Sequence, residues 1–400
     1  MKCIVYIGDF DLRNENVQAT LVKNNGRVLN DLGYAVAYIG VNRDACDFSQ
    51  IEVLPPMDMG MNSYLELPYT LSIRGLFAYR DIVKRVISYM NSLAQRMDVK
   101  YLISYQAPTY APILSAVAKW CRANRVKYIV NCADLPIFDS QPFVRRMVME
   151  LNWRILHRIT RNQADGIIAV SKYIERFYTK ENRPSIVLPP LFNEKVDTKY
   201  KGNETAAFLY AGTPFVVLDR EVNPKGMKDR LDKVVELFLQ LAGQETEFRF
   251  NILGITKEAY VTCVPRHRQA LEQEQKIVFY GRKTHSETLD MLTQSDFMVN
   301  IRDKNLMTEA GLSTKVVESV SVGTPVVMNP IGDTFDYLDE GITGFALSED
   351  SQTSINLMKH LCALSREERL SMKYRCSEKK PFSCDAYREK ISSFLSCLNK

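Results

Sequence analysis

The sequence has few of the residues that build metal centres and disulfide frameworks. Only four histidines occur among its 400 residues, too far apart along the chain to form a helical pair of metal ligands. The nine cysteines include no Cys-x-x-Cys pair, and their odd number in mostly apolar surroundings indicates reduced thiols. We therefore expect a cytoplasmic protein that holds neither a metal ion nor a resident cofactor.

Long hydrophobic runs are also missing. No run of about 18 apolar residues is present, so the sequence predicts no helix that crosses a bilayer. Residues 3–8 resemble a buried strand and not the apolar centre of a signal peptide. Because proteins that act on lipid-linked molecules can bind a membrane without spanning it, peripheral contact with the inner face of the membrane stays open.

Charge is unevenly distributed along the chain. Residues 1–193 carry a net charge of +7 and residues 194–400 carry −2, within a total of +5. The first half is therefore the candidate for binding an anionic partner, and an ordinary solvated surface is an equally weighted alternative. We expect no nucleic-acid partner, because no basic stripe with interleaved aromatic residues lies on a recognised nucleic-acid-binding module.

Short apolar runs alternate with longer amphipathic ones in both halves, which is the pattern of parallel sheets covered by helices. A chain of this length suits two such domains of about 200 residues each. In the first half, strands are expected at 2–7, 34–40, 100–105, 127–132, 166–170 and 185–188, and helices at 16–32, 80–97, 109–124, 142–163 and 171–178. In the second half, strands are expected at 206–211, 247–253, 276–280, 296–301, 325–328 and 344–347, and helices at 228–242, 264–273, 285–294, 313–322, 351–362 and 387–398.

The alternation stops at Pro189-Pro190 and the polar run that follows. Neither a Pro pair nor a run of charged residues continues a buried strand, so we place the linker here. The sequence thus predicts an α/β protein with two Rossmann-like, doubly wound domains that face a cleft. The domains are residues 1–192 and 206–380, joined by a linker at 193–205, and a helix within 381–400 is expected to return to the first domain.

The most specific pattern lies within residues 296–345. A buried strand is followed by Ala310-Gly311-Leu312-Ser313-Thr314-Lys315, where a helix is expected to begin, with Glu318 one turn into it and Gly323-Thr324-Pro325 after it. Amide groups at a helix start can bind phosphate oxygens. A carboxylate in the following turn can accept hydrogen bonds from two ribose hydroxyls.

These residues resemble the donor motif of retaining glycosyltransferases of family 4, and in particular a branch common among bacterial surface-polysaccharide enzymes. The resemblance implies the GT-B fold, with the nucleotide-sugar donor held by the C-terminal domain and with no metal requirement. Glu318 matches the second glutamate of the motif, which holds the donor ribose. The first glutamate is replaced by Ala310, and Glu309 lies one position early, so the spacing departs from the family pattern.

Further donor residues follow from the same resemblance. The segment 311–315, that is Gly311, Leu312, Ser313, Thr314 and Lys315, is expected to contact the donor, as are Gly212 and Thr213 after the first strand of the second domain. Lys228 is the first choice for the cation that stabilises the departing diphosphate, and Lys225 is the second. The backbone near Gly281 and Arg282 is expected to contact the base. Arg302 is expected to face the cleft and to contact phosphate.

Candidate acceptor residues lie where strands of the first half end. They are Gly8, Asp9, Asn14, Tyr105 and Asp134, and they are assigned by position alone. Asp9-Phe10-Asp11 also matches the Asp-x-Asp metal motif of the other glycosyltransferase fold, but such short strings are common, and we expect no metal here.

The helix expected at 142–163 carries five arginines and one glutamate, with large apolar residues between them. It could bind anionic lipid. A helix packed in the core with a solvated basic face is the interpretation that we favour from the sequence.

The sequence therefore predicts a glycosyltransferase that transfers a hexosyl or related sugar from a nucleotide-sugar donor to a hydroxyl of a sugar or lipid-linked glycan, with retention, in polysaccharide or glycolipid biosynthesis. Two alternatives stay open. One is a sugar-nucleotide 2-epimerase of the same fold, which would need no acceptor. The other, which the Ala310 departure keeps open, is a non-catalytic, nucleotide-binding partner of another transferase.

Overall fold

The computed structural model describes residues 1–13, 16–45, 57–59, 62–68, 73–135, 143–179, 183–196, 199–218, 221–223 and 229–399. The chain forms two compact units. The first contains Met1–Leu191 and Cys384–Lys400, and the second contains Phe192–Ser383. Across the described ranges, no helix is long and apolar enough to span a membrane.

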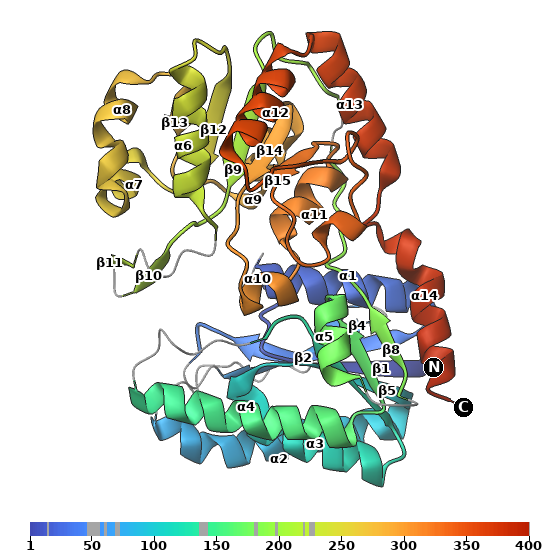
Figure 1. The fold of residues 1–400 in the computed structure, drawn as a ribbon. Helices are drawn as coiled ribbons and strands as arrows, with labels where there is room; N and C mark the ends of the chain where they lie inside the picture. Colours follow the sequence, from blue (N-terminus) through green and yellow to red (C-terminus); the bar gives the residue numbers. More distant parts are fainter. Residues whose placement is uncertain are drawn as a thin grey trace. The chain divides into compact units, whose positions relative to one another are not determined.

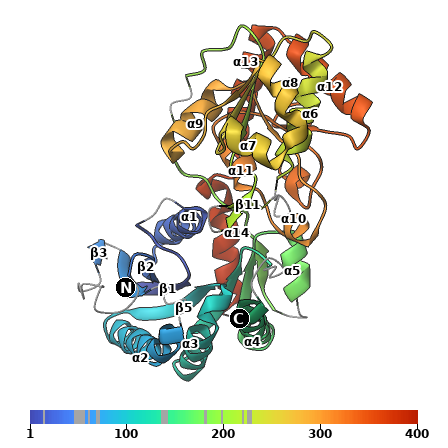
Figure 2. The ribbon, with the colours of Figure 1, turned by 90° about the vertical axis from the view of Figure 1, so that its left-hand side faces the viewer.

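The first unit is built on an eight-stranded sheet with the order β3-β4-β2-β1-β5-β6-β7-β8. All neighbouring strands are parallel except β3 and β4. Helices α2, α3 and α4 cover one face of the sheet, and α1 lies on the other face (Figures 1 and 2). The elements are β1 (Lys2–Gly8), α1 (Val17–Asp31), β2 (Ala35–Asn42), β3 (Met57–Met59), β4 (Asn62–Pro68), α2 (Ile73–Arg96), β5 (Asp98–Tyr105), α3 (Ala111–Ala123), β6 (Lys127–Cys132), α4 (Phe143–Gln163), β7 (Gly166–Ala169), α5 (Lys172–Tyr178), β8 (Ser185–Val187) and α14 (Cys384–Cys397).

Local sequence explains how the first strand–helix–strand unit forms. The Asn16 side chain accepts a hydrogen bond from the amide of Ala19 and caps α1. Gly33 ends the helix with a φ of 86°, which a residue with a Cβ adopts at a cost. The central strands β1 and β2 are apolar along their length because helices cover both faces of a parallel sheet.

The C-terminal helix α14 completes the core of the first unit. Tyr387, Ile391, Phe394 and Leu395 are buried in the same cluster as side chains of β1 and β5. The hydroxyl of Tyr101 in β5 donates to the carbonyl of Leu395 over 3.0 Å. The last helix of the chain is therefore part of the first unit, on the face that also carries α1.

The second unit is built on a six-stranded parallel sheet with the order β13-β12-β9-β14-β15-β16. Helices α6 and α12 pack together, as do α9 and α11. A short antiparallel pair, β10 and β11, follows β9. The elements are β9 (Ala207–Ala211), β10 (Val216–Leu218), β11 (Glu221–Asn223), α6 (Leu231–Ala242), β12 (Arg249–Leu253), α7 (Lys257–Cys263), α8 (Arg268–Gln273), β13 (Ile277–Phe279), α9 (His285–Gln294), β14 (Phe297–Asn300), α10 (Leu306–Ala310), α11 (Thr314–Ser321), β15 (Val326–Met328), β16 (Gly344–Ala346), α12 (Ser351–Ala363) and α13 (Arg366–Lys379).

Charged groups are buried where α13 meets this sheet. The ammonium of Lys373, 1% exposed, donates to the carbonyl of Ser295 and to the hydroxyl of Thr324. Burial lowers the pKa of Lys373 to about 7. The Arg369 guanidinium lies 3.2 Å from the buried carboxylate of Asp296. The Gly-Thr-Pro turn is thus tied to α13 through Thr324.

The predicted fold class, two Rossmann-like α/β domains, is confirmed. Residues 193–205, predicted as the linker, belong to the second unit, where Tyr200 is buried and donates a hydrogen bond to the carbonyl of Val322. The sequence did not predict several elements. These are β3, β4, β10, β11, α7, α10 and α13.

Replacing Phe394 with alanine is expected to destabilise the first unit by about 3 kcal/mol or more, because the substitution leaves a cavity in its core. Urea unfolding measures the loss. Ser393→Ala on the exposed side of the same helix is the matched control and should change the free energy of unfolding by less than about 0.5 kcal/mol. Equal effects in both variants would show that α14 is not part of this core.

Candidate functional site

A glycine follows the carboxyl end of each of three neighbouring strands in the second unit, along the same edge of the sheet. Gly212 follows β9, Gly254 follows β12 and Gly281 comes after β13, each with positive φ. The amide of Gly254 donates to the carbonyl of Gly281 over 2.7 Å, and a Cβ at Gly254 would collide with the backbone of Gly212. This edge therefore presents bare backbone, which lets a ligand approach closely.

The Lys315 side chain passes directly over Gly212. A Cβ at Gly212 would overlap the end of that side chain, so glycine is needed for Lys315 to take this path. Its ammonium reaches the carboxylate of Asp229 at 2.7 Å. Asp229 is 1% exposed and precedes α6, whereas Lys315 lies in the first turn of α11 and is partly exposed.

The carboxylate of Asp229 contacts polar groups that come from both β9 and β14, the two neighbouring strands between which the strand order reverses. The hydroxyl of Tyr210 on β9 donates to it over 3.0 Å. Nε of Arg302, which comes after β14, lies 3.1 Å from its other oxygen, although not aligned as a hydrogen bond. Burial alone would raise the pKa of Asp229, but Lys315 and Arg302 outweigh burial and hold this pKa below its ordinary value. Two cations around one carboxylate leave a net positive charge beside the glycine edge.

Arg302 was expected to face an open site. Instead its side chain is 4% exposed, and its backbone is tied to the side chain of Asn329 by two hydrogen bonds. The structure therefore corrects the expected exposure of Arg302, because its guanidinium is buried beside the carboxylate of Asp229.

The start of α11 supplies free amide groups near Lys315. Ser313 is the N-cap residue, and its side chain makes no capping hydrogen bond. The amides of Val316 and Val317 donate to the carbonyl of Ser313, which leaves the amides of Thr314 and Lys315 to bind an anion. Gly311 and Leu312 lead into this turn, and Ala310 is fully buried.

Glu318 lies one turn further along α11 and is partly exposed. Desolvation raises its pKa, His285 and Lys315 act in the opposite direction, and Glu194 adds to the increase. His285 begins α9, and its Nε2 lies 2.8 Å from a carboxylate oxygen of Glu194. The carboxyl of Glu318 is therefore half-buried within reach of the charges of His285, Lys315 and Glu194, and not sealed in an apolar interior.

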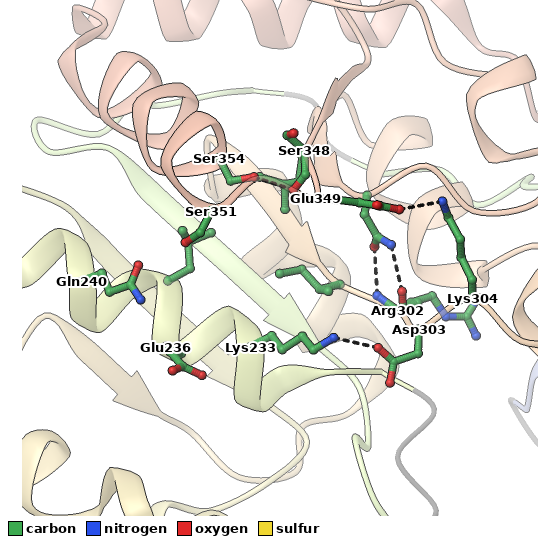
Figure 3. A pocket seen from close by; sticks show the side chains of 14 residues that line it. Lys233, Glu236, Gln240, Arg302, Asp303, Lys304, Ser348, Glu349, Ser351 and Ser354 are labelled. Carbon is green, nitrogen blue, oxygen red and sulfur yellow. Dashed lines mark hydrogen bonds and ion pairs between the residues drawn. The ribbon is translucent and has the colours of Figure 1, made fainter.

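A pocket of about 530 Å³ lies beside the site, between α6, α12 and the segments that follow β14, β15 and β16 (Figure 3). Two ion pairs join charged groups of its lining, Lys233 with Asp303 at 2.8 Å and Lys304 with Glu349 at 3.0 Å. Arg302 lines this pocket and also contacts Asp229, so the pocket and the site share one wall.

Of the remaining predicted donor residues, two are exposed at the glycine edge and two lie outside the described residues. Thr213 and Arg282 are exposed beside Gly212 and Gly281. Lys225 and Lys228, the predicted diphosphate cations, and Asn14 lie outside the described residues.

Four predicted acceptor residues come together in the first unit. Gly8, Tyr105 and Asp134 end or follow the adjacent strands β1, β5 and β6, and a Cβ on Gly8 would collide with Tyr105. Burial raises the pKa of Tyr105, and the charges of Asp134 and Asp9 raise it further. The site predicted from position alone is thus a polar cluster at the carboxyl edge of this sheet.

The two carboxylates of the Asp-x-Asp string have separate partners. Asp9 lies 2.7 Å from the guanidinium of Arg43 and accepts a hydrogen bond from Thr109. Asp11 is fully buried and lies 2.8 Å from Arg13. No cluster of potential metal ligands is found among the residues that the structure describes.

The comparisons with known proteins bear on the second unit first. Residues 215–377 match the family model "Glycosyl transferases group 1". The chain carries a glycosyltransferase domain. It is therefore a glycosyltransferase, and the prediction of an enzyme of this class is confirmed. The search of curated proteins returned no match.

Solved structures with the same architecture cover the whole chain at low identity. Sucrose-phosphate synthase from Thermosynechococcus elongatus has a TM-score of 0.65 at 13% identity, over 100% of this chain and 99% of that one. Anabaena HepE in complex with UDP has a TM-score of 0.66 at 12% identity, over 99% and 100%. The pneumococcal O-GlcNAc transferase GtfA in complex with UDP and GlcNAc has a TM-score of 0.59 at 11% identity, over 99% of each chain. These likenesses show the GT-B fold.

Three residues of the site were not predicted from the sequence. They are Asp229, Tyr210 and Gly254, which hold Lys315 and shape the glycine edge. Asp229 had a usable signal, because it follows Lys228 immediately and precedes the first buried residue of a helix. Tyr210 and Gly254 lie in ordinary strand and turn patterns and had none.

Asp229→Asn is expected to destabilise the second unit by about 3 kcal/mol, because two cations would lose their buried counter-charge. Asp303→Asn is the matched control: it pairs with Arg230 and Lys233 near the surface and should lose less than about 1 kcal/mol. Chemical denaturation of both variants measures the difference. Similar losses would mean that Asp229 does not organise the site.

Proposed function

We propose that this glycosyltransferase transfers a sugar from a nucleoside-diphosphate sugar held by the second unit to a hydroxyl acceptor, with retention of the anomeric configuration. The observation that carries the proposal is the Lys315 ammonium, held over Gly212 by the buried Asp229, beside the start of α11. A cation and free amides at the point where strand order reverses form a site for a diphosphate.

The diphosphate is the leaving group, and its negative charge grows as the bond to the sugar breaks. Lys315 is proposed to neutralise that charge, and Lys228 and Lys225 are assigned the same role from the sequence pattern. Because protein cations supply this charge, the proposed reaction needs no metal ion.

Glu318 is proposed to accept hydrogen bonds from the two ribose hydroxyls. It lies one turn beyond Lys315 on the same helix, which suits a ligand whose diphosphate meets the helix start. Gly281 and Arg282 are proposed to border the base. The UDP and UDP-glucose complexes of HepE make uridine diphosphate sugars the first donors to test.

The transfer step can proceed without a protein nucleophile. The bond between the anomeric carbon and the diphosphate oxygen breaks, and the acceptor oxygen forms its bond on the same face. The acceptor proton passes to an oxygen of the departing phosphate. The acceptor is proposed to bind at Gly8, Asp9, Asn14, Tyr105 and Asp134, and we propose a sugar or lipid-linked glycan of polysaccharide or glycolipid biosynthesis.

A thermal-shift screen against nucleoside diphosphates and their sugars tests the donor site. A ligand at about 100 times its Kd adds about 2.7 kcal/mol of stability, so the correct base should stand out. Radiolabelled donor turnover then separates the alternatives. Epimerisation without acceptor would indicate a 2-epimerase, and binding without transfer to any acceptor would indicate a non-catalytic partner.

Gly212→Ala is expected to weaken nucleotide binding at least about tenfold, because the new methyl group occupies the path of Lys315. Gly243→Ala is the matched control, since φ there is −63° and a Cβ meets only ordinary contacts. Isothermal titration with the best nucleotide measures both. Unchanged affinity in Gly212→Ala would contradict the proposed position of the diphosphate.

Glu318→Ala and Lys228→Ala are each expected to lose most of the turnover, roughly 100-fold, while remaining folded. Glu349→Ala and Lys359→Ala, both exposed in the same unit, are the controls and should retain full activity. Initial rates with saturating donor, together with unfolding curves, provide the comparison. Full activity in either test variant refutes the role assigned to that residue.

A further inference from the structure

Helix α4 of the first unit exposes a large apolar surface. Between residues 143 and 155 it carries six large apolar side chains whose exposed fractions run from 37% for Ile155 to 76% for Phe143. They recur at helical spacing along one stripe and are Phe143, Val144, Met147, Val148, Leu151 and Ile155.

The opposite side of the helix packs against the unit only toward its C-terminal end. Leu156, Ile159 and Thr160 are the residues of α4 that are buried. The expectation that this helix is packed in the core is therefore wrong for its first half, where the apolar side chains point away from the unit. Figure 2 shows α4 at the end of the helical layer that also contains α2 and α3.

Arginine side chains extend the exposed apolar stripe of α4 toward the C-terminal end of the helix. Arg154 and Arg158 continue the spacing of Phe143, Met147 and Leu151, so the apolar stripe becomes basic toward the C-terminus. Arg145 and Arg161 are also exposed. Among the described residues, no carboxylate lies within ion-pair distance of these four arginines, and Glu150, the only acidic residue of α4, pairs with Arg146 at 2.7 Å.

We propose that α4 docks the protein on an anionic lipid bilayer. The helix lies along the surface, its apolar stripe enters the boundary between headgroups and acyl chains, and the arginines bind lipid phosphates. Exposed apolar side chains with unpaired cations on one helical face are the features by which helices bind such an interface. The docking does not depend on the proposed sugar transfer.

A second copy of the chain fits this surface less well. Two α4 helices packed together would bring their arginines into an interface with a single acidic residue on each helix, and that residue already has a partner. Burying unpaired guanidinium groups is unfavourable. A bilayer instead offers acyl chains to the apolar half and phosphates to the basic half.

Vesicle sedimentation tests the docking with the full chain. Phosphatidylcholine vesicles that contain about one-third phosphatidylglycerol should bind the protein, and pure phosphatidylcholine should bind it far more weakly. Equal binding to both vesicles, or no binding to either, would overturn the proposal.

Two pairs of substitutions separate the apolar and electrostatic contributions. Arg154→Gln with Arg158→Gln should weaken binding to the anionic vesicles about 25-fold, at about fivefold per charge. Met147→Ser with Leu151→Ser should weaken it by a comparable factor. The control, Lys119→Gln with Arg122→Gln, removes two exposed charges from α3 and should change binding less than about twofold.

Two further measurements distinguish a failure of membrane docking from a failure of the proposed sugar transfer. All variants should keep the wild-type urea midpoint and nucleotide-induced thermal shift, because the α4 side chains changed are exposed and lie in the other unit from the donor site. Light scattering without vesicles should show no self-association. Self-association that Met147→Ser with Leu151→Ser abolishes would assign the stripe to a second copy and overturn membrane docking.

Discussion

The ion pairs of the buried Asp229 carboxylate are the interaction on which the proposed donor site depends. A carboxylate with 1% exposure is stable only with compensating charge, and here Lys315 and Arg302 provide it from two different segments. The same carboxylate also takes a hydrogen bond from Tyr210 on the central strand. One group therefore fixes the end of β9, the start of α6, the exit of β14 and the first turn of α11 relative to one another. Because the cations outnumber the carboxylate, this anchoring leaves a positive site for an anionic ligand.

Gly212 and Gly254 are the second requirement for this arrangement of Lys315 and Asp229. Lys315 can cross the end of β9 only because Gly212 has no side chain, and Gly254 lacks one because the backbone of Gly212 is too close. The path of Lys315 thus depends on Gly212, and the position of the Gly212 backbone depends in turn on Gly254. The carboxyl edge of this sheet consequently presents backbone without side chains next to the ammonium of Lys315, which suits the diphosphate binding proposed above.

The sequence predicted most of the fold because buried parallel strands are continuous apolar runs and the helices between them are periodic. It failed for α13, whose inward-facing Arg369 and Lys373 are charged, so that no apolar stripe marks the helix. It predicted the start of α11 through a local motif, and the roles that the motif assigns to Lys315 and Glu318 stay predictions. It could not predict that Arg302 is buried or that Asp229 joins it to Lys315, since that pairing links residues 73 and 86 positions apart from Asp229 and only the folded sheet brings them together. For α4 the sequence showed the right residues, but which side of the helix is covered depends on tertiary packing.

The placement of α14 has a consequence for how the chain is made. The chain leaves the first unit after Leu191 and re-enters it at Cys384, so the whole second unit is inserted within the first. During synthesis the second unit is complete before the first unit receives Phe394, Leu395 and Leu398. Proteins usually fold their N-terminal domain first as they emerge from the ribosome. Here the part of the N-terminal sheet that α14 covers stays open until the residues of α14 have been added.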